Sequence, residues 1–191
     1  MKRSIVTTFT FLIITTLLVT YFHGQGPQNL QGKQLKIEEI KHMISKVEKN
    51  MDDLRQETLA KSLANVSERY QIDAKILIAI IDTESDFRHE MISKTGDVSL
   101  AQINPRIWDK ELLRLGRAPL DKKQLKVSEE YAIERMTEIL SIIKLRYEKR
   151  DSHWYARYHS NTKKHRKFYQ HKLGKKLNLI AASELHVISK N

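Results

Sequence analysis

The sequence of 191 residues contains no cysteine and few residues that interrupt regular structure, with six glycines and three prolines. Without cysteine, neither a disulfide framework nor a thiolate metal site can form. Scarce glycine and proline favour long helices joined by short turns. Apolar residues make up 40% of the chain, and its length is typical of a single domain. We therefore expect one helical domain that is stabilised by its apolar core alone.

Acidic residues are also in short supply: 23 Asp and Glu stand against 34 Lys and Arg, a formal net charge of +11. A field of that sign attracts polyanions such as nucleic acid, anionic lipid head groups or acidic cell-wall polymers. The charge by itself does not choose between them.

Charged side chains are missing from Ser4 to Phe22, directly after the cationic start Met1-Lys2-Arg3. This layout indicates a secretory signal. The stretch approaches the roughly 18–20 residues that span a bilayer, so a cleaved signal and an uncleaved membrane anchor remain alternatives. Either one predicts an exported, periplasmic or secreted protein, and export argues against nucleic acid as the partner.

The chain is expected to divide into four parts: a signal or anchor at 1–23, a linker and amphipathic accessory helix at 24–58, a catalytic domain at 59–178 and a tail at 179–191. The linker, at 24–33, is rich in Gly, Gln and Asn. Apolar residues then recur in steps of three and four, which predicts one helix; they are Ile37, Ile40, Ile44, Val47, Met51 and Leu54. A helix laid along the domain is favoured over a self-association device.

Within the domain, helical patterns dominate and no segment alternates convincingly like a strand. Helices are expected over 59–69, over 74–84 after the N-cap Asp73, from Asn104-Pro105 to Gly116, after Ser128, through 153–158, and from 162 to about 177. The predicted fold class is all-α, with at most a minor β-hairpin near Asp97.

Glu84 ends an apolar helical run, where a carboxylate is costly unless it has a partner or a task. Low-dielectric surroundings disfavour an ionised carboxyl, and a general acid must hold its proton near neutral pH. Glycoside cleavage needs such an acid, because the leaving oxygen must be protonated. Taken alone, an exposed helix-end glutamate is the simpler interpretation.

Three segments in order favour the catalytic interpretation: ILIAIIDTESDF at 76–87, GDVSLAQINP at 96–105 and WYARYHS at 154–160. Together they resemble the soluble lytic transglycosylases, also called the transglycosylase SLT or goose-type lysozyme-like family. The resemblance covers about Tyr70 to Leu173 and implies a lysozyme-like helical domain. The Tyr-His-Ser ending is most similar to small wall-cutting members that accompany secretion machines, which implies secretion machinery as a partner.

The resemblance also implies roles for individual residues. Glu84 would be the catalytic acid and afterwards the base, and Ser85 would support it and touch the sugar. Gln102 would hydrogen-bond substrate in the groove. Tyr158 would place its hydroxyl on the Glu84 carboxyl and orient it.

The chain departs from the family pattern at two motifs. The family usually shows Gly-Leu-Met-Gln where this chain has Ser99-Leu100-Ala101-Gln102, so Ser99 is expected where backbone passes close to sugar. The third motif commonly reads Ala-Tyr-Asn, whereas here His159 follows Tyr158 and is expected to line the cleft.

The function implied by the resemblance is cleavage of the β-1,4 bond between N-acetylmuramic acid and N-acetylglucosamine in peptidoglycan, without cofactor or metal. Lytic transglycosylases resemble one-acid enzymes in which the sugar supplies the nucleophile and a 1,6-anhydro end forms. Asp97 is the candidate for positioning a water, which would make the protein a hydrolytic lysozyme; a turn residue beside Gly96 is the favoured interpretation. A non-catalytic wall-binding or secretion-scaffold module is the alternative of another class, although a pure binder needs no buried acid.

Two further patterns receive plain interpretations. The histidines of the C-terminal third lack metal-ligand spacing with carboxylates. A basic face is formed by Lys163, Lys164, Arg166, Lys167, Lys172, Lys175 and Lys176. It is either a solvated face or a surface for anionic wall polymer or membrane.

Overall fold

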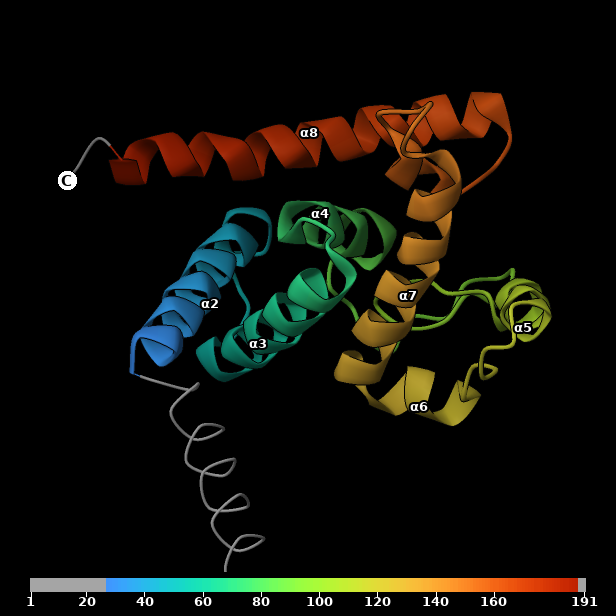
Figure 1. Ribbon diagram of the computed structural model, residues 1–191, viewed down its shortest axis with the longest axis horizontal. Helices are drawn as coiled ribbons and strands as arrows, with labels where there is room; N and C mark the ends of the chain where they lie inside the picture. The colour runs from blue at the N-terminus through green and yellow to red at the C-terminus, as the bar shows by residue number, and fades with distance from the viewer. Residues whose placement is uncertain (1–26, 189–191) are drawn as a thin grey trace, which may run out of the picture. The chain divides into compact units, whose positions relative to one another are not determined.

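The computed structural model describes residues 27–188, most of them helical (Figure 1). The helices are α2 (Pro27–Val47), α3 (Asp53–Tyr70), α4 (Ala74–Ser85), α5 (Pro105–Arg114), α6 (Lys122–Val127), α7 (Glu129–Tyr147), the 3-10 helix η1 (Trp154–Tyr158) and α8 (Lys163–Ile188). The chain divides into two compact units, residues 1–36 and 37–191. The predicted signal or anchor at 1–23 lies outside the described residues. Between residues 27 and 188, no helix is both long and apolar enough to cross a bilayer.

The all-α prediction is confirmed for the described residues. The minor hairpin expected near Asp97 is reduced to two isolated antiparallel bridges, in which Val98 pairs with Ile92 and with Ile103. These bridges fold the connection between α4 and α5 into a compact loop beside the end of α4.

Helix α4 lies in the middle of the core because it is apolar around most of its circumference. Leu77 through Ile81 are each fully buried. Asp73 caps the helix as predicted, since its carboxylate accepts from the Lys75 amide, and Asp86 ends it in a left-handed conformation. Helices α3 and α8 both pack on α4, and Figure 1 shows α8 running across it. The end of α4 is therefore held from two sides.

The periodic stretch from Ile37 to Leu54 forms parts of two helices, so the prediction of one helix is wrong. Helix α2 ends at Val47, and Asp52 caps α3 by accepting from the Arg55 amide. Ile40 and Ile44 are buried in the core, whereas the Leu54 side chain is 77% exposed. Residues 27–33, expected in the linker, belong to α2. The buried positions agree with a helix laid along the domain.

The C-terminal half follows the sequence pattern with two differences. Ser128 caps α7 as predicted, accepting from the Tyr131 amide. Helix α6, which precedes it, was not expected. Helix α8 continues to Ile188, so residues 179–188 are helical and do not form the predicted tail. Helix α8 also contacts η1. The domain limits 59 and 178 stay a prediction.

Candidate active site

A groove of about 360 Å³ opens beside the C-terminal end of α4. Its walls come from α4, the loop after it, α5 and the segment around η1. The lining residues are Glu84, Asp97, Gln102, Asn104, Ile107, Trp108, Arg157, Tyr158, His159, Ser160 and Asn161. All three sequence motifs therefore contribute to one cavity.

Glu84 lies in the last turn of α4, and its side chain is only 12% exposed. Its Oε1 atom is buried, and no group in the described residues reaches it with full hydrogen-bond geometry, although His159 Nδ1 lies 3.8 Å away. A buried acceptor without a donor is costly and uncommon in folded proteins. Such an arrangement is typical of a group that takes part in chemistry, as predicted for Glu84.

Tyr158 lines the groove, but its predicted contact is wrong. Its hydroxyl donates to the Ala101 carbonyl at 2.7 Å instead of to the Glu84 carboxyl. Burial, with the charges of Glu84 and Asp97, raises the pKa of Tyr158 well above its ordinary value, so the phenol stays neutral. Tyr158 therefore ties η1 to the loop that carries Gln102.

Tyr169 of α8 is a site residue that the motifs missed. Its side chain is 3% exposed, and neither its hydroxyl nor Glu84 Oε1 has a partner with full hydrogen-bond geometry. Burial first, and then the negative charge of Glu84, raise the pKa of Tyr169 well above its ordinary value. The apolar spacing of Tyr169, Leu173 and Ile180, all buried, could have indicated the inward face of α8.

His159 lines the groove as expected. Its Nδ1 lies 3.8 Å from Glu84 Oε1, and its ring stacks on Tyr169 with centroids 4.7 Å apart and planes inclined by 11°. The Glu84 carboxylate is the main cause that raises the pKa of His159, while burial and Lys172 oppose it. The imidazole therefore gains its proton more readily than a free histidine would.

Ser85 and Ser99 are both buried and do not line the groove, and their sugar contacts stay a prediction. The Ser85 hydroxyl donates to the Leu100 carbonyl at 2.7 Å and thereby anchors the loop to α4. Ser99 is fully buried and has a φ of +74°. A serine in this left-handed region costs about 1 kcal/mol, a strain that the family's usual glycine avoids.

Gln102 lies in the groove wall, as predicted. Its amide nitrogen donates to the backbone carbonyls of Met91 and Ser99, at 3.1 and 2.9 Å. These two bonds fix the side chain and leave its amide oxygen as the atom able to accept from a substrate hydroxyl or N–H group.

Asp97 lines the groove but serves mainly to hold its loop. Ser93 and Thr95 donate to Oδ2 at 2.7 and 2.6 Å, and Asn104 donates to Oδ1 at 2.7 Å. Burial by itself would raise the pKa of Asp97, but these hydrogen bonds outweigh it and lower the pKa. The favoured interpretation as a turn residue agrees with this geometry.

A buried ion pair fastens α8 beside the site. Lys176 Nζ lies 2.6 Å from Asp82 Oδ2, and the Asp82 side chain is 3% exposed. Burial raises the pKa of Asp82, and the nearby Lys176 opposes that shift. Because Asp82 is on α4, the pair holds the helix that carries Tyr169 against the helix that carries Glu84.

The remaining groove walls combine apolar and cationic groups. Ile107 and Trp108 of α5 form an apolar side. Arg157 adds a positive charge to the groove wall. It forms an ion pair with Asp151, and its guanidinium carbon lies 4.0 Å from the centroid of the Tyr147 ring. Among the described residues, no group of three His, Asp or Glu side chains could hold a metal ion.

Comparison with known proteins places the chain in a family. The model of the transglycosylase SLT domain matches residues 62–179, more than half of the chain. The chain therefore belongs to this family, which confirms the predicted family.

Among solved structures, the chain is similar to an inactive mutant of the lytic transglycosylase Slt from Pseudomonas aeruginosa. The two share 16% identity with a TM-score of 0.48, over 65% of this chain and 28% of that one. No curated protein sequence matches the chain.

Proposed function

We propose that the protein cuts the β-1,4 bond between N-acetylmuramic acid and N-acetylglucosamine in peptidoglycan by a lytic transglycosylase reaction. The observation that carries the proposal is the buried Glu84 carboxyl, which faces the groove of a transglycosylase SLT domain. Glu84 donates its proton to the leaving glycosidic oxygen as that bond breaks. The 6-hydroxyl oxygen of the same sugar then attacks the anomeric carbon, and the Glu84 carboxylate takes the proton of that hydroxyl.

The groove also supplies groups that suit a sugar. Gln102 offers its amide oxygen to hydroxyl or acetamide N–H groups, and the half-buried Trp108 offers an apolar surface to a sugar face. Tyr158 would act indirectly, by holding the loop in place.

A hydrolytic reaction would need a second carboxylate to position water. Asp97 is the candidate, but three side-chain donors already occupy its two oxygens. Asp97→Asn is therefore expected to keep activity within about tenfold, below the ~10²–10⁴-fold that a general base contributes. The measurement is turnover on purified peptidoglycan, with product masses.

The products decide between the two reactions. Wild type and Asp97→Asn should both release 1,6-anhydro ends, lighter by one water than reducing ends. Reducing-end products together with a severe Asp97→Asn defect would establish a lysozyme and overturn the transglycosylase reaction. Absence of glycan cleavage by the wild type would favour the non-catalytic module.

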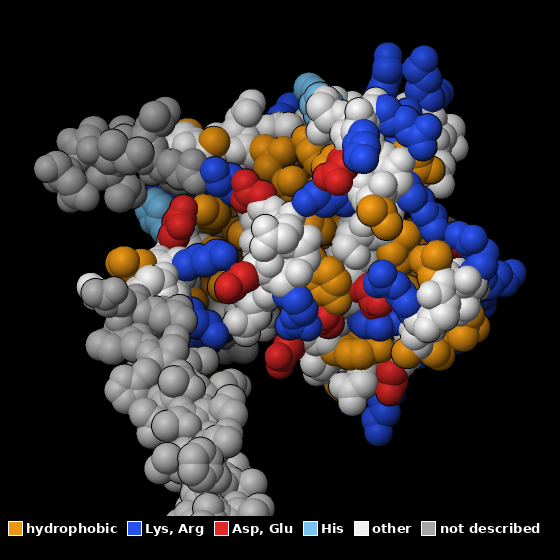
Figure 2. All heavy atoms as spheres, in the orientation of Figure 1, with side chains coloured by type: hydrophobic (Ala, Val, Ile, Leu, Met, Phe, Trp, Pro, Cys, Tyr) orange, Lys and Arg blue, Asp and Glu red, His pale blue; other side chains and the backbone are white. Residues whose placement is uncertain are grey.

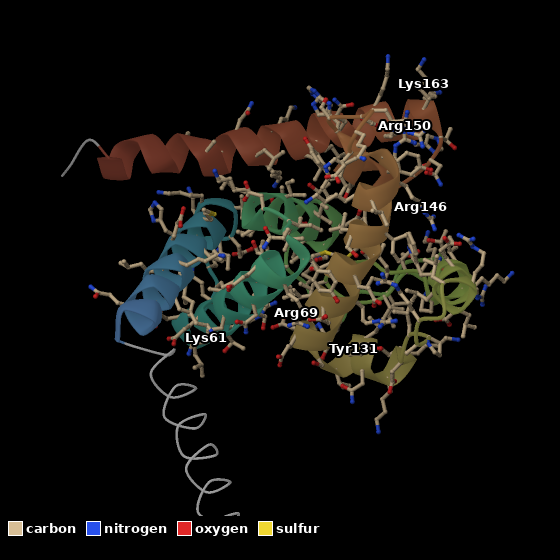
Figure 3. All side chains as sticks on the ribbon, viewed as in Figure 1. Lys61, Arg69, Tyr131, Arg146, Arg150 and Lys163 are labelled. Atoms are coloured by element: carbon tan, nitrogen blue, oxygen red, sulfur yellow. The ribbon has the colours of Figure 1, made fainter. Side chains whose placement is uncertain are left out.

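We further propose that the protein is exported and that its basic α8 surface contacts anionic wall polymer. Lys163, Lys164 and Lys167 are exposed directly after the groove residues Ser160 and Asn161. Lys and Arg side chains gather around this end of α8 in Figure 2, and Figure 3 labels Lys163 and Arg150 there. Secretion machinery and a membrane surface stay predicted partners.

Export is tested by fractionating cells that make the full chain or a variant lacking residues 1–23. The full chain should be found outside the cytoplasm and the shortened one inside, because the apolar stretch would carry the targeting information. Equal cytoplasmic recovery of both forms would contradict export.

A further inference from the structure

His159 is the groove residue at which this chain both departs from the family motif and approaches the catalytic carboxyl. Its Nδ1 is 3.8 Å from Glu84 Oε1. The almost parallel stack on Tyr169 restricts the plane of the ring. Tyr169 is itself buried on α8. The imidazole is thus held next to Glu84 by a rigid neighbour.

Titratable groups from α4, the loop after it, η1 and α8 surround His159. Glu84 of α4 and Asp97 of the loop are negative, Lys172 of α8 is positive, and Tyr158 and Tyr169 are neutral phenols. Glu84 is the dominant influence and favours the protonated imidazole. Asn, the residue that the family commonly has here, carries no charge at any pH.

We propose that His159 is a positioning residue for Glu84: its imidazole, stacked on Tyr169, orients the carboxyl and, when protonated, stabilises the carboxylate form. The inference rests on the proposed function of Glu84. When Glu84 gives its proton to the leaving oxygen, the neighbouring imidazolium stabilises the carboxylate that forms. Glu84 then recovers a proton from the 6-hydroxyl, and His159 keeps its own proton throughout.

The sign of the pH effect follows from the shared environment. The Glu84 carboxylate beside His159 favours retention of the imidazole proton and raises the pKa of His159. A neutral residue in place of either group removes this interaction. The pH dependence that the imidazole gives to kcat/KM should therefore disappear when His159 is replaced by asparagine.

The first test measures the pair directly and needs no substrate. NMR titration of the His159 ring is compared in wild type and Glu84→Gln, which removes the charge and keeps the shape. The midpoint should fall in Glu84→Gln, because the Glu84 carboxylate is the main cause that raises the pKa of His159. Coincident midpoints would overturn the inference.

The second test uses activity. His159→Asn should change the pH profile of kcat/KM in the range where the imidazole titrates, whereas His165→Asn, at an exposed position outside the groove, should leave the profile unchanged. Superposable His159→Asn and wild-type profiles would contradict the inference. In a Tyr169→Leu background, which lacks the stack, Glu84→Gln should lower the His159 midpoint by less than it does in the wild type; an equal shift in both backgrounds would exclude the stack as the positioning element.

The two proposals fail in different ways. A wild type that does not cleave glycan, or a Glu84→Gln variant that does, overturns the proposed function. A wild type that cleaves and a Glu84→Gln variant that does not, combined with unchanged His159 titration, overturn the role of His159 alone.

Discussion

Glu84→Gln should abolish glycan cleavage, with a loss of at least about a thousandfold, because one carboxyl performs both proton transfers. The amide has nearly the same shape as the acid but cannot deliver a proton to the leaving oxygen. The fold should be retained, since Glu84 Oε1 accepts no hydrogen bond from the described protein groups. Turnover on purified peptidoglycan and thermal unfolding of the same preparation are the measurements.

A matched control is available on α3. Glu68 is exposed and does not line the groove, so Glu68→Gln should keep wild-type turnover. Near-wild-type activity of Glu84→Gln would show that the acid has been assigned to the wrong residue.

Lys176→Met is expected to destabilise the protein and to lower its activity together. Methionine preserves much of the apolar stem but leaves Asp82 buried without its cation. Removing one partner of a fully buried pair costs ~3–5 kcal/mol. Because Lys176 is 35% exposed, we expect about 1–3 kcal/mol. Unfolding should therefore occur roughly 3–10 °C lower.

The companion variants separate charge from packing. Asp82→Asn combined with Lys176→Met removes the uncompensated charge and should recover part of the lost stability. Lys175→Met, at the exposed neighbouring position, should unfold at the wild-type temperature. A Lys176→Met variant as stable as wild type would mean that the pair does not fasten α8 to α4.

Activity should fall in Lys176→Met even below its unfolding temperature. Helix α8 carries Tyr169, on which His159 stacks, and α4 carries Glu84. Loosening the contact between these helices would change the position of both groups around the carboxyl. Wild-type turnover in a destabilised Lys176→Met variant would show that the ion pair contributes to stability but not to activity.

Sequence patterns predicted the helices whose ends carry local signals. Asp73, Asn104 and Ser128 each accept a hydrogen bond from a backbone N–H group in the first turn of the helix that follows. Such caps act between residues two or three positions apart, so they can be recognised without tertiary information. The break between Val47 and Asp52 was missed although Asp52 is a cap of the same kind, because the apolar period continues through the break and favours one helix.

Motif spacing predicted that Glu84, Gln102 and His159 would share a groove, and the fold brings them together. Motif spacing did not predict the hydrogen-bond acceptors of the Ser85 and Tyr158 hydroxyl groups. Ser85 turns to Leu100 and Tyr158 turns to Ala101, because buried hydroxyls donate to the nearest available carbonyl. Those carbonyls lie on a loop whose position depends on the surrounding packing.

By itself, the sequence determined the all-α class and the family and predicted that Glu84 lines the groove, because periodicity, capping and motif order are properties of neighbouring residues. Tertiary structure decided which groups surround that acid. Tyr169 lies 85 residues after Glu84 in the sequence, and Lys176 lies 94 residues after Asp82. Both reach the site only because α8 packs on α4. Contacts between segments so far apart depend on how whole helices pack, which no local pattern specifies.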